Sequence, residues 1–230
     1  MRAIFARFLT VCAVSLFAVS AQAQVPPGDA EYAAYTGLHA AAAKGDVAAI
    51  ARLGADESRL NTRDGYGRTP LMVAAYAKRP AAAKALIAAG ADLDALERDR
   101  YDVVTIASVA NDVTMLKIAI AAGAKPGQMT SPYDGTALIA AAHLGHVDVV
   151  KTLIAAGAPL DHVNNLNWTA LIESIVLGDG GANHIACLKA LVDAGANVNI
   201  ADGNGVSPLS LAQRHGYDEM IRILKAAGAK

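Results

Sequence analysis

Apolar and polar positions recur along the chain in blocks of similar length. Aliphatic, alanine-rich runs such as residues 84–89 and 151–156 each end in Ala-Gly-Ala. The glycines of this phrase, at spacings of 33, 34, 38 and 33 residues, are Gly90, Gly123, Gly157, Gly195 and Gly228. Glycine adopts the left-handed conformation that ends a helix at little cost, so each of these positions predicts a helix end.

A second series predicts helix starts. Its members, spaced 33, 33, 34, 33 and 38 residues apart, are Thr36, Thr69, Asp102, Thr136, Thr169 and Ser207. Each side-chain oxygen can accept from the free amides of a first helical turn, and Pro70 and Pro208 suit the first helical position. Start and end lie 21 residues apart in four repeats, which fits two short helices with a turn. The pattern predicts six helix-turn-helix units.

Two units depart from this spacing. The first has Glu57 where the terminal glycine is expected. The fifth has 26 residues from Thr169 to Gly195, and we expect the five extra ones, near residues 178–183, to form a flexible enlargement of its turn. The polar remainder of each period, such as residues 64–67 and 202–205, predicts a projecting hairpin-like loop.

Several of these motifs resemble the ankyrin repeat. They are Asp-Gly-Tyr-Gly-Arg-Thr-Pro-Leu at residues 64–71, Gly-His-Val-Asp-Val-Val-Lys-Thr-Leu at 145–153 and Ala-Gly-Ala-Asn-Val-Asn at 194–199. The resemblance implies an all-α ankyrin-repeat solenoid with β-hairpin fingers over residues 31–230. Its units would be residues 31–63, 64–96, 97–130, 131–163, 164–201 and 202–230. The last helix, with Asp218, Glu219, Arg222 and Lys225, suits a polar terminal cap.

Residues 1–23 have the features of a secretory signal peptide. Arg2 and Arg7 precede an apolar run over residues 9–19, and Ala-Gln-Ala at 21–23 is typical of a cleavage site. A membrane span is the alternative, but this run is shorter than the ~20 residues that cross a bilayer. A lipoprotein is rejected because Cys12 lies inside the apolar run. We expect cleavage after Ala23, a short linker over residues 24–30 and no span in the mature chain.

Composition narrows the interpretation further. The formal net charge is −1, and without residues 1–23 it becomes −3 because two arginines leave and no acid does. Nucleic acid is therefore not expected as a partner. All three phenylalanines, Phe5, Phe8 and Phe17, also precede residue 24. The core must then consist of Ala, Leu, Ile and Val, which suits closely packed helices.

Aromatic residues concentrate in one part of the repeat. Six of the eight Tyr and Trp residues lie within five positions before a helix start, where an even spread over 207 residues predicts about one. Rings and arginines are typical of interface hot spots. The expected partner-binding residues are Tyr32, Tyr35, Tyr66, Arg68, Tyr76, Tyr101, Tyr133, His143, Trp168 and Arg214. The alternative is that alanine-rich packing leaves no room for rings and excludes them to the surface.

Evidence for other chemistry is weak. His143 and His146, with His162 or His39, are conceivable metal ligands, but His39 and His146 match ordinary positions of the ankyrin motif. The glycines of residues 178–181 lack the Gly-Lys-Ser/Thr ending of a phosphate loop. Cys187 aligns with a valine and is interpreted as a small buried hydrophobe. We expect no enzyme and no cofactor.

The sequence therefore predicts a monomeric, non-enzymatic scaffold in a bacterial periplasm. It would bind or regulate another exported protein through its concave face and fingers. The alternative is a secreted effector that binds a host protein, and a metal-dependent enzyme ranks third. The sequence does not identify the partner.

Overall fold

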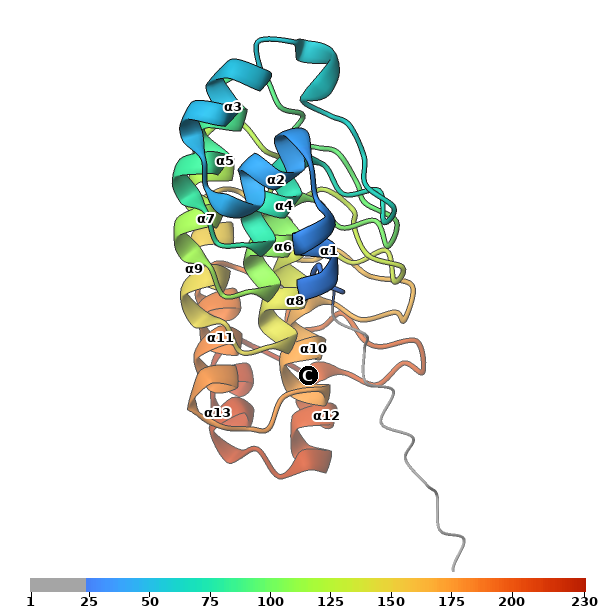
Figure 1. Cartoon of the computed structure of the whole chain (residues 1–230). Coiled ribbons are helices and arrows are strands. Elements are labelled where there is room, and N and C mark those ends of the chain that lie inside the picture. The colour runs from blue at the N-terminus through green and yellow to red at the C-terminus, as the bar shows by residue number, and fades with distance from the viewer. Residues whose placement is uncertain (1–23) are drawn as a thin grey trace, which may run out of the picture.

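The structure, a computed structural model, describes residues 24–230 as 13 α-helices and one 3-10 helix. The helices form two layers along an elongated stack, and the loops between repeats project on one side (Figure 1). Each first helix of a repeat packs against its own second helix and against the first helices of the neighbouring repeats. This arrangement confirms the predicted all-α ankyrin-repeat solenoid.

The inner layer, next to the loops, contains the first helices of the six repeats. They are α2 (Gly37–Lys44), α4 (Pro70–Tyr76), α6 (Val103–Val109), α8 (Ala137–His143), α10 (Ala170–Val176) and α12 (Pro208–His215). The outer layer is formed by α3 (Val47–Leu53), α5 (Pro80–Ala88), α7 (Val113–Ala121), α9 (Val147–Ala155), α11 (Ala182–Asp193) and α13 (Asp218–Ala226). The 3-10 helix η1 (Glu57–Arg59) follows α3, and α1 (Asp29–Ala34) precedes the array.

All six predicted helix starts are N-cap residues. Five of them accept a hydrogen bond from the backbone amide three residues later, and Thr36 alone among the six does not. Asp102 makes the shortest of these bonds, 2.7 Å from its Oδ1 to the amide nitrogen of Thr105. The side chains thus satisfy amides that a first turn leaves without a helical partner.

The predicted helix ends are also confirmed. All five terminal glycines have φ between 82° and 102°, and they are Gly90, Gly123, Gly157, Gly195 and Gly228. This left-handed conformation costs a residue with a Cβ atom about 1 to 2 kcal/mol, whereas glycine adopts it without that cost. In the first repeat α3 ends at Leu53 without such a glycine, because Gly54 has φ of −76°.

Small and aliphatic residues form the core between the two layers. The second residue after each helix start is aliphatic and buried in every repeat; these residues are Leu38, Leu71, Val104, Leu138, Leu171 and Leu209. Residues 24–230 contain no phenylalanine, and fully buried alanines such as Ala42, Ala82 and Ala142 allow the helices to pack closely.

The expected β-hairpin fingers are tight turns. In finger two the amide of Asp64 donates to the carbonyl oxygen of Arg68 and the amide of Gly67 donates back to Asp64. Across residues 24–230 the only β-bridge pairs Thr130 with Gly135. These loops are called fingers below and are numbered by the repeat whose first helix they precede, so that fingers two to five are residues 64–68, 97–101, 131–135 and 164–168.

In the fifth repeat the five extra residues are divided between the turn and the second helix, whereas the prediction placed all of them in the turn. The turn between α10 and α11 has five residues, 177–181, where the turn between α8 and α9 has three. Helix α11 has 12 residues, against nine in α9. Two of the five extra residues therefore lengthen the turn, and three add to the start of the second helix.

The insertion is also held by both neighbouring repeats. His184 lies with Nδ1 2.8 Å from Asp179 Oδ1 and donates from Nε2 to the carbonyl oxygen of His143 at 2.9 Å. On the other side the Tyr217 hydroxyl donates to the carbonyl oxygen of Gly178 at 3.1 Å. The expectation of a flexible edge is wrong, because contacts with repeats four and six anchor this turn.

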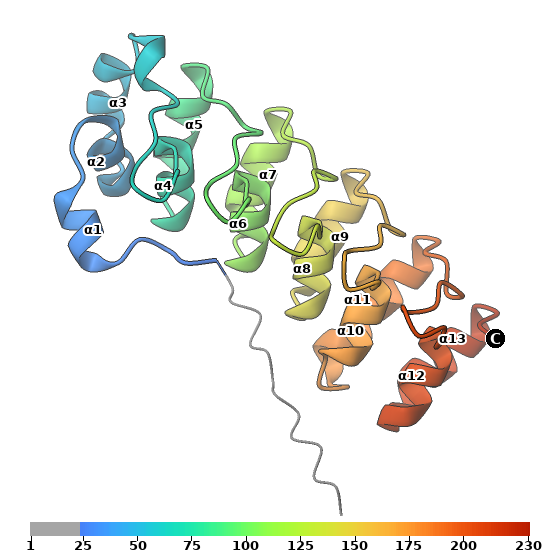
Figure 2. The same ribbon diagram turned by 90° about the vertical axis from the view of Figure 1, so that its right-hand side faces the viewer.

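The predicted linker over residues 24–30 packs against the array. Helix α1 includes Asp29 and Ala30, and the side chains of Gln24 and Pro27 are buried. Figure 2 shows this segment running from α1 past the end of α4. We call residues 24–35 the N-terminal strap. The predicted signal peptide, residues 1–23, lies outside the described residues.

Candidate functional site

The fingers of the candidate binding surface are shaped by the side chain that lies five positions before a helix start, as in fingers two and five. Asp64 Oδ1 accepts from the amides of Tyr66 and Arg68 at 2.8 and 2.9 Å. Asn164 Oδ1 does the same for the amides of Leu166 and Trp168, both at 3.0 Å. Side-chain oxygens that bond nearby backbone amides stabilise a turn locally, so each of these two fingers has a defined shape.

Neighbouring fingers are joined through their backbones. The amide of Arg98 donates to the carbonyl oxygen of Tyr66, and the amide of Ser131 donates to that of Arg100. A third bond runs from the amide of Asn165 to the carbonyl oxygen of Tyr133. Fingers two to five therefore form a continuous edge, which positions their exposed side chains relative to one another.

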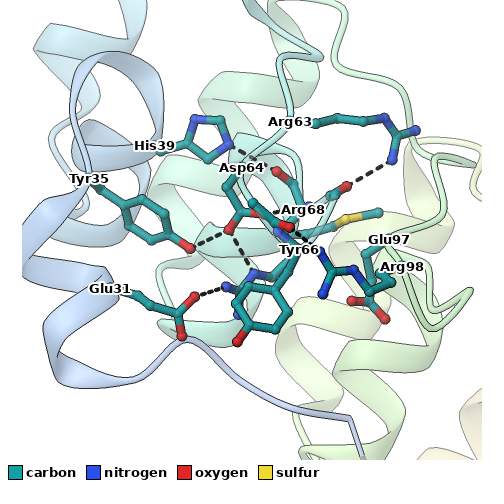
Figure 3. Close-up of polar contacts among 12 residues, drawn as sticks. Glu31, Tyr35, His39, Arg63, Asp64, Tyr66, Arg68, Glu97 and Arg98 are labelled. Carbon is teal, nitrogen blue, oxygen red and sulfur yellow. Dashed lines mark hydrogen bonds and ion pairs between the residues drawn. The ribbon is translucent and has the colours of Figure 1, made fainter.

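The burial of Arg68 contradicts the prediction that this residue contacts a partner. Its side chain is 0% exposed, and its guanidinium pairs with Asp64, at 2.8 Å from Nε to Oδ2, and with Glu31 of the strap (Figure 3). The Tyr35 hydroxyl donates to the same Asp64 oxygen at 2.7 Å. Two carboxylates balance this charge and the strap covers it, so Arg68 positions finger two and offers no surface to a partner.

Tyr101 is the second predicted contact that the structure places in the interior. Its side chain is 6% exposed, and burial together with nearby Asp99 and Glu97 raises its pKa to about 12. In repeat three this ring belongs to the packed core. The expectation that Tyr101 contacts a partner is wrong because its ring is covered by its own repeat stack.

Two other predicted residues meet at the strap. Tyr32 of α1 and Tyr76 at the end of α4 both line an open hollow of about 530 Å³, together with Lys44 and Arg79. The Tyr76 hydroxyl is buried without a hydrogen-bond partner in residues 24–230, and burial raises its pKa. The structure thus brings together residues that lie 44 positions apart in the sequence.

Apart from Tyr35, which ends the strap, the remaining predicted residues lie along the array from finger two to α12. Tyr66 is 39% exposed at the tip of finger two, and Arg214 is exposed on α12. Tyr133, His143 and Trp168 are partly exposed. Tyr35 is partly exposed and bonded to Asp64. Eight of the ten predicted residues therefore retain accessible surface, and we carry these eight forward as proposed contacts.

Glu173 was not predicted, and it lies beside the predicted residue His143. Its side chain on α10 is buried, with the residue 3% exposed. Oε1 accepts from Asn164 Nδ2 at 3.0 Å, whereas Oε2, 3.6 Å from His143 Nδ1, has no hydrogen bond in residues 24–230. Burial raises the pKa of Glu173 to about 7, and burial and nearby His184 lower the pKa of His143.

A sequence signal for Glu173 existed. It stands four residues after a helix start, where repeats two, three and six have Val73, Ile106 and Leu211. A carboxylate at an apolar position of a repeat is a buried ionisable group, and such groups often mark functional sites. Its hydrogen bond to Asn164 connects the inner layer to finger five.

Three of the four histidines considered as metal ligands bond backbone carbonyl groups: His39 and His146 each reach a neighbouring repeat, and His162 bonds within its own. His39 Nε2 bonds the carbonyl oxygen of Arg68 at 2.9 Å, His146 Nδ1 that of Ser108 at 2.9 Å and His162 Nε2 that of Asp134 at 2.6 Å. Among residues 24–230 no three His, Cys, Asp or Glu side chains are grouped as a metal site would require. None of the helices described for these residues is long and apolar enough to cross a membrane.

Cys187 lies in the core. Its thiol is buried on α11, and burial raises its pKa to about 11. A thiolate is the reactive form of cysteine, so this environment disfavours nucleophilic chemistry. The interpretation as a small buried hydrophobe is confirmed.

Comparison with known proteins agrees with this architecture. A family model described as ankyrin repeats in three copies matches residues 10–97 and 104–202. The ankyrin repeat protein YahD of Escherichia coli K12 is 34% identical over 191 residues, which cover 82% of this chain and 94% of YahD.

Solved structures give the same result. An ankyrin repeat domain from Acinetobacter baumannii AYE is 43% identical with a TM-score of 0.80, covering 84% of this chain and 98% of that domain. The ankyrin repeat domain of Bcl-3, described as a member of the IkappaB family, is 28% identical with a TM-score of 0.76. That match covers 86% of this chain and 88% of the Bcl-3 domain.

Proposed function

Because this chain belongs to the ankyrin-repeat family, whose arrays are protein-protein interaction scaffolds, we propose that it binds another exported protein in the bacterial periplasm. The observation that carries this proposal is the continuous edge of fingers two to five. Backbone hydrogen bonds join these fingers, so a partner meets a surface that is ordered before it binds. Ordering in advance lowers the entropic cost of association.

The exposed side chains on this edge support a protein as the ligand. Tyr66, Tyr133 and Trp168 carry exposed or partly exposed rings, and hydrogen bonds within the fingers fix the backbone at each of them. His143 is partly exposed at the end of α8. Rigid rings contribute large contact areas at little entropic cost, which is why they dominate protein interfaces. The function is that of a binding scaffold without catalysis.

Crosslinking tests where the partner binds. A photoreactive amino acid replaces Tyr133 in one variant and Lys151, on outer helix α9, in a matched control. We expect a single defined adduct from periplasmic extract at position 133 and none at 151. Tyr133→Ala with Trp168→Ala should then weaken binding of the identified partner at least tenfold, since each ring removed from a hot spot costs about 1 to 2 kcal/mol. Equal crosslinking at both positions would contradict the proposal.

The location is tested separately. The features of residues 1–23 support export, and a reporter that is active only outside the cytoplasm, fused after Lys230, should be active and retained with the periplasmic fraction. Release of the fusion into the medium would favour a secreted effector, and activity confined to a cytoplasmic reporter would refute export.

A further inference from the structure

The tip of finger two carries an arrangement that the strap leaves uncovered. The ring of Tyr66 lies between two guanidinium groups, with the Arg68 carbon 4.5 Å and the Arg98 carbon 4.9 Å from the ring centroid (Figure 3). Arg68 is buried, whereas Tyr66 and Arg98 are exposed. Cations over the face of an aromatic ring are attracted to its quadrupole, so the ring and Arg98 hold one another in place.

A second exposed arginine contacts the same turn. Arg63 donates from Nη1 to the carbonyl oxygen of Gly67 at 2.8 Å, and Arg98 donates from Nη2 to that of Gly65. These two carbonyl groups lie two residues apart, on either side of Tyr66. Each guanidinium has five donors in a fixed plane, so both arginines are oriented while other donors remain available.

The guanidinium groups of Arg63 and Arg98 form no ion pair within the described residues. Within residues 24–230 neither guanidinium lies within 4.0 Å of a carboxylate, although Arg59, Arg68, Arg100 and Arg222 each have such a partner. The Arg98 backbone amide is bonded to Tyr66, which fixes finger three against finger two. The tip of finger two is therefore an ordered surface with two positive charges that have no ion-pair partner within 4.0 Å in residues 24–230.

From this arrangement, and resting on the proposed function, the geometry points to an acidic segment of the partner protein as the ligand of Arg63, Tyr66 and Arg98. Two oriented guanidinium groups match two carboxylates, each of which accepts paired hydrogen bonds from one arginine. The tyrosine ring between them offers apolar contact and a hydroxyl group. A nucleic acid fits less well, because the chain is net negative and a polyanion needs many positive contacts.

The first experiment needs no partner. The ¹⁵N-labelled chain is titrated with the synthetic peptide Gly-Glu-Glu-Asp-Glu-Gly, and amide chemical shifts are followed at low salt. We expect saturable shifts confined to residues 63–68 and 97–100, weakened about tenfold or more by Arg63→Gln with Arg98→Gln and reduced by salt. The matched control, Lys84→Gln with Lys117→Gln on the outer helices α5 and α7, removes the same charge and should bind like the unaltered chain.

Three outcomes would overturn the inference. They are equal shifts with the neutral peptide Gly-Gln-Gln-Asn-Gln-Gly, equal weakening by the control substitutions, and tighter binding of a twelve-residue oligothymidylate at the same amides. Substituting both arginines by lysine keeps the charge but loses the planar fork, so it should restore only part of the affinity. Because both side chains are exposed, we expect all variants to keep the melting temperature within about 2 °C.

The partner identified by crosslinking separates the two proposals. If Tyr133→Ala with Trp168→Ala weakens its binding but Arg63→Gln with Arg98→Gln does not, the acidic-segment inference fails and the scaffold proposal stands. If the peptide binds at finger two and the aromatic substitutions leave partner binding unchanged, the proposed binding edge fails. Weakening by both pairs supports both.

Discussion

Glu173→Gln removes a buried carboxylate and keeps its shape. The glutamine oxygen can still accept from Asn164 Nδ2, which bonds the carboxylate at 3.0 Å in the native chain. What disappears is an ionisable group whose Oε2 has no hydrogen-bond partner among residues 24–230. Burying a charge without full hydrogen bonding costs stability, so we expect the substitution to stabilise the fold whenever the native carboxyl is ionised.

The size and pH range follow from the pKa of Glu173, which burial raises from 4.5 to about 7. Below pH 4.5 the carboxyl is protonated in the folded and unfolded chains, and the substitution should change little. Between the two pKa values the folded chain binds more protons than the unfolded chain, so native stability falls as the pH rises. Above pH 7 the penalty reaches about 3 kcal/mol, at about 1.4 kcal/mol for each unit between the two pKa values.

Urea unfolding at pH 4.5 and pH 8.5 measures this difference. We expect Glu173→Gln to raise the free energy of unfolding by about 2 to 3 kcal/mol at pH 8.5 and by less than about 0.5 kcal/mol at pH 4.5. The control is Glu57→Gln, at an exposed glutamate of η1, which should change stability by a few tenths of a kcal/mol at either pH. An equal gain at both pH values, or a Glu173→Gln variant less stable than the native chain at pH 8.5, would refute the reasoning.

Three further predictions test other parts of the array. In urea unfolding, Gly180→Ala should destabilise the chain by about 1 to 3 kcal/mol more than the control Gly205→Ala. Both glycines have positive φ, but only at position 180 would the added Cβ atom lie 2.4 Å from the Tyr217 ring. Arg68→Met should lower the free energy of unfolding by about 3 to 5 kcal/mol in the same assay, because it leaves Glu31 and Asp64 without their cation. A decrease below about 1 kcal/mol would contradict a structural role for Arg68. Peptide mass spectrometry after treatment with a thiol reagent should find Cys187 unmodified at pH 8 until the chain unfolds, because burial raises its pKa to about 11.

The helix boundaries were predictable because their causes are local. A cap residue such as Thr169 bonds an amide three residues away, and a terminal glycine such as Gly195 is selected by its own φ. Neither depends on distant parts of the chain. Because the same cap residues and glycines recur in each repeat, the same prediction is made several times along the chain. These local causes account for most of the fold.

The strap and the burial of Arg68 were not predictable in this way. Glu31 and Arg68 lie 37 residues apart, and no local pattern connects them. From its place directly before a helix start, Arg68 was predicted to be exposed and to contact a partner. Its true environment depends on a strap carboxylate, on Asp64 and on the hydroxyl of Tyr35, and only the folded arrangement brings these groups together.

The strap also determines where a partner gains its binding energy. A partner that displaced residues 24–35 would remove Glu31 from the fully buried guanidinium of Arg68 and leave Asp64 as its one carboxylate. It would also uncover the part of the core against which Tyr32 and Tyr35 pack. Breaking a buried pair of this kind costs several kcal/mol, which new contacts would first have to offset. The edge from Tyr66 to Trp168 carries no such cost, because its fingers are already joined and their rings already exposed in part. Affinity is therefore expected to depend on finger residues, and substitutions of Glu31 should alter stability far more than partner binding.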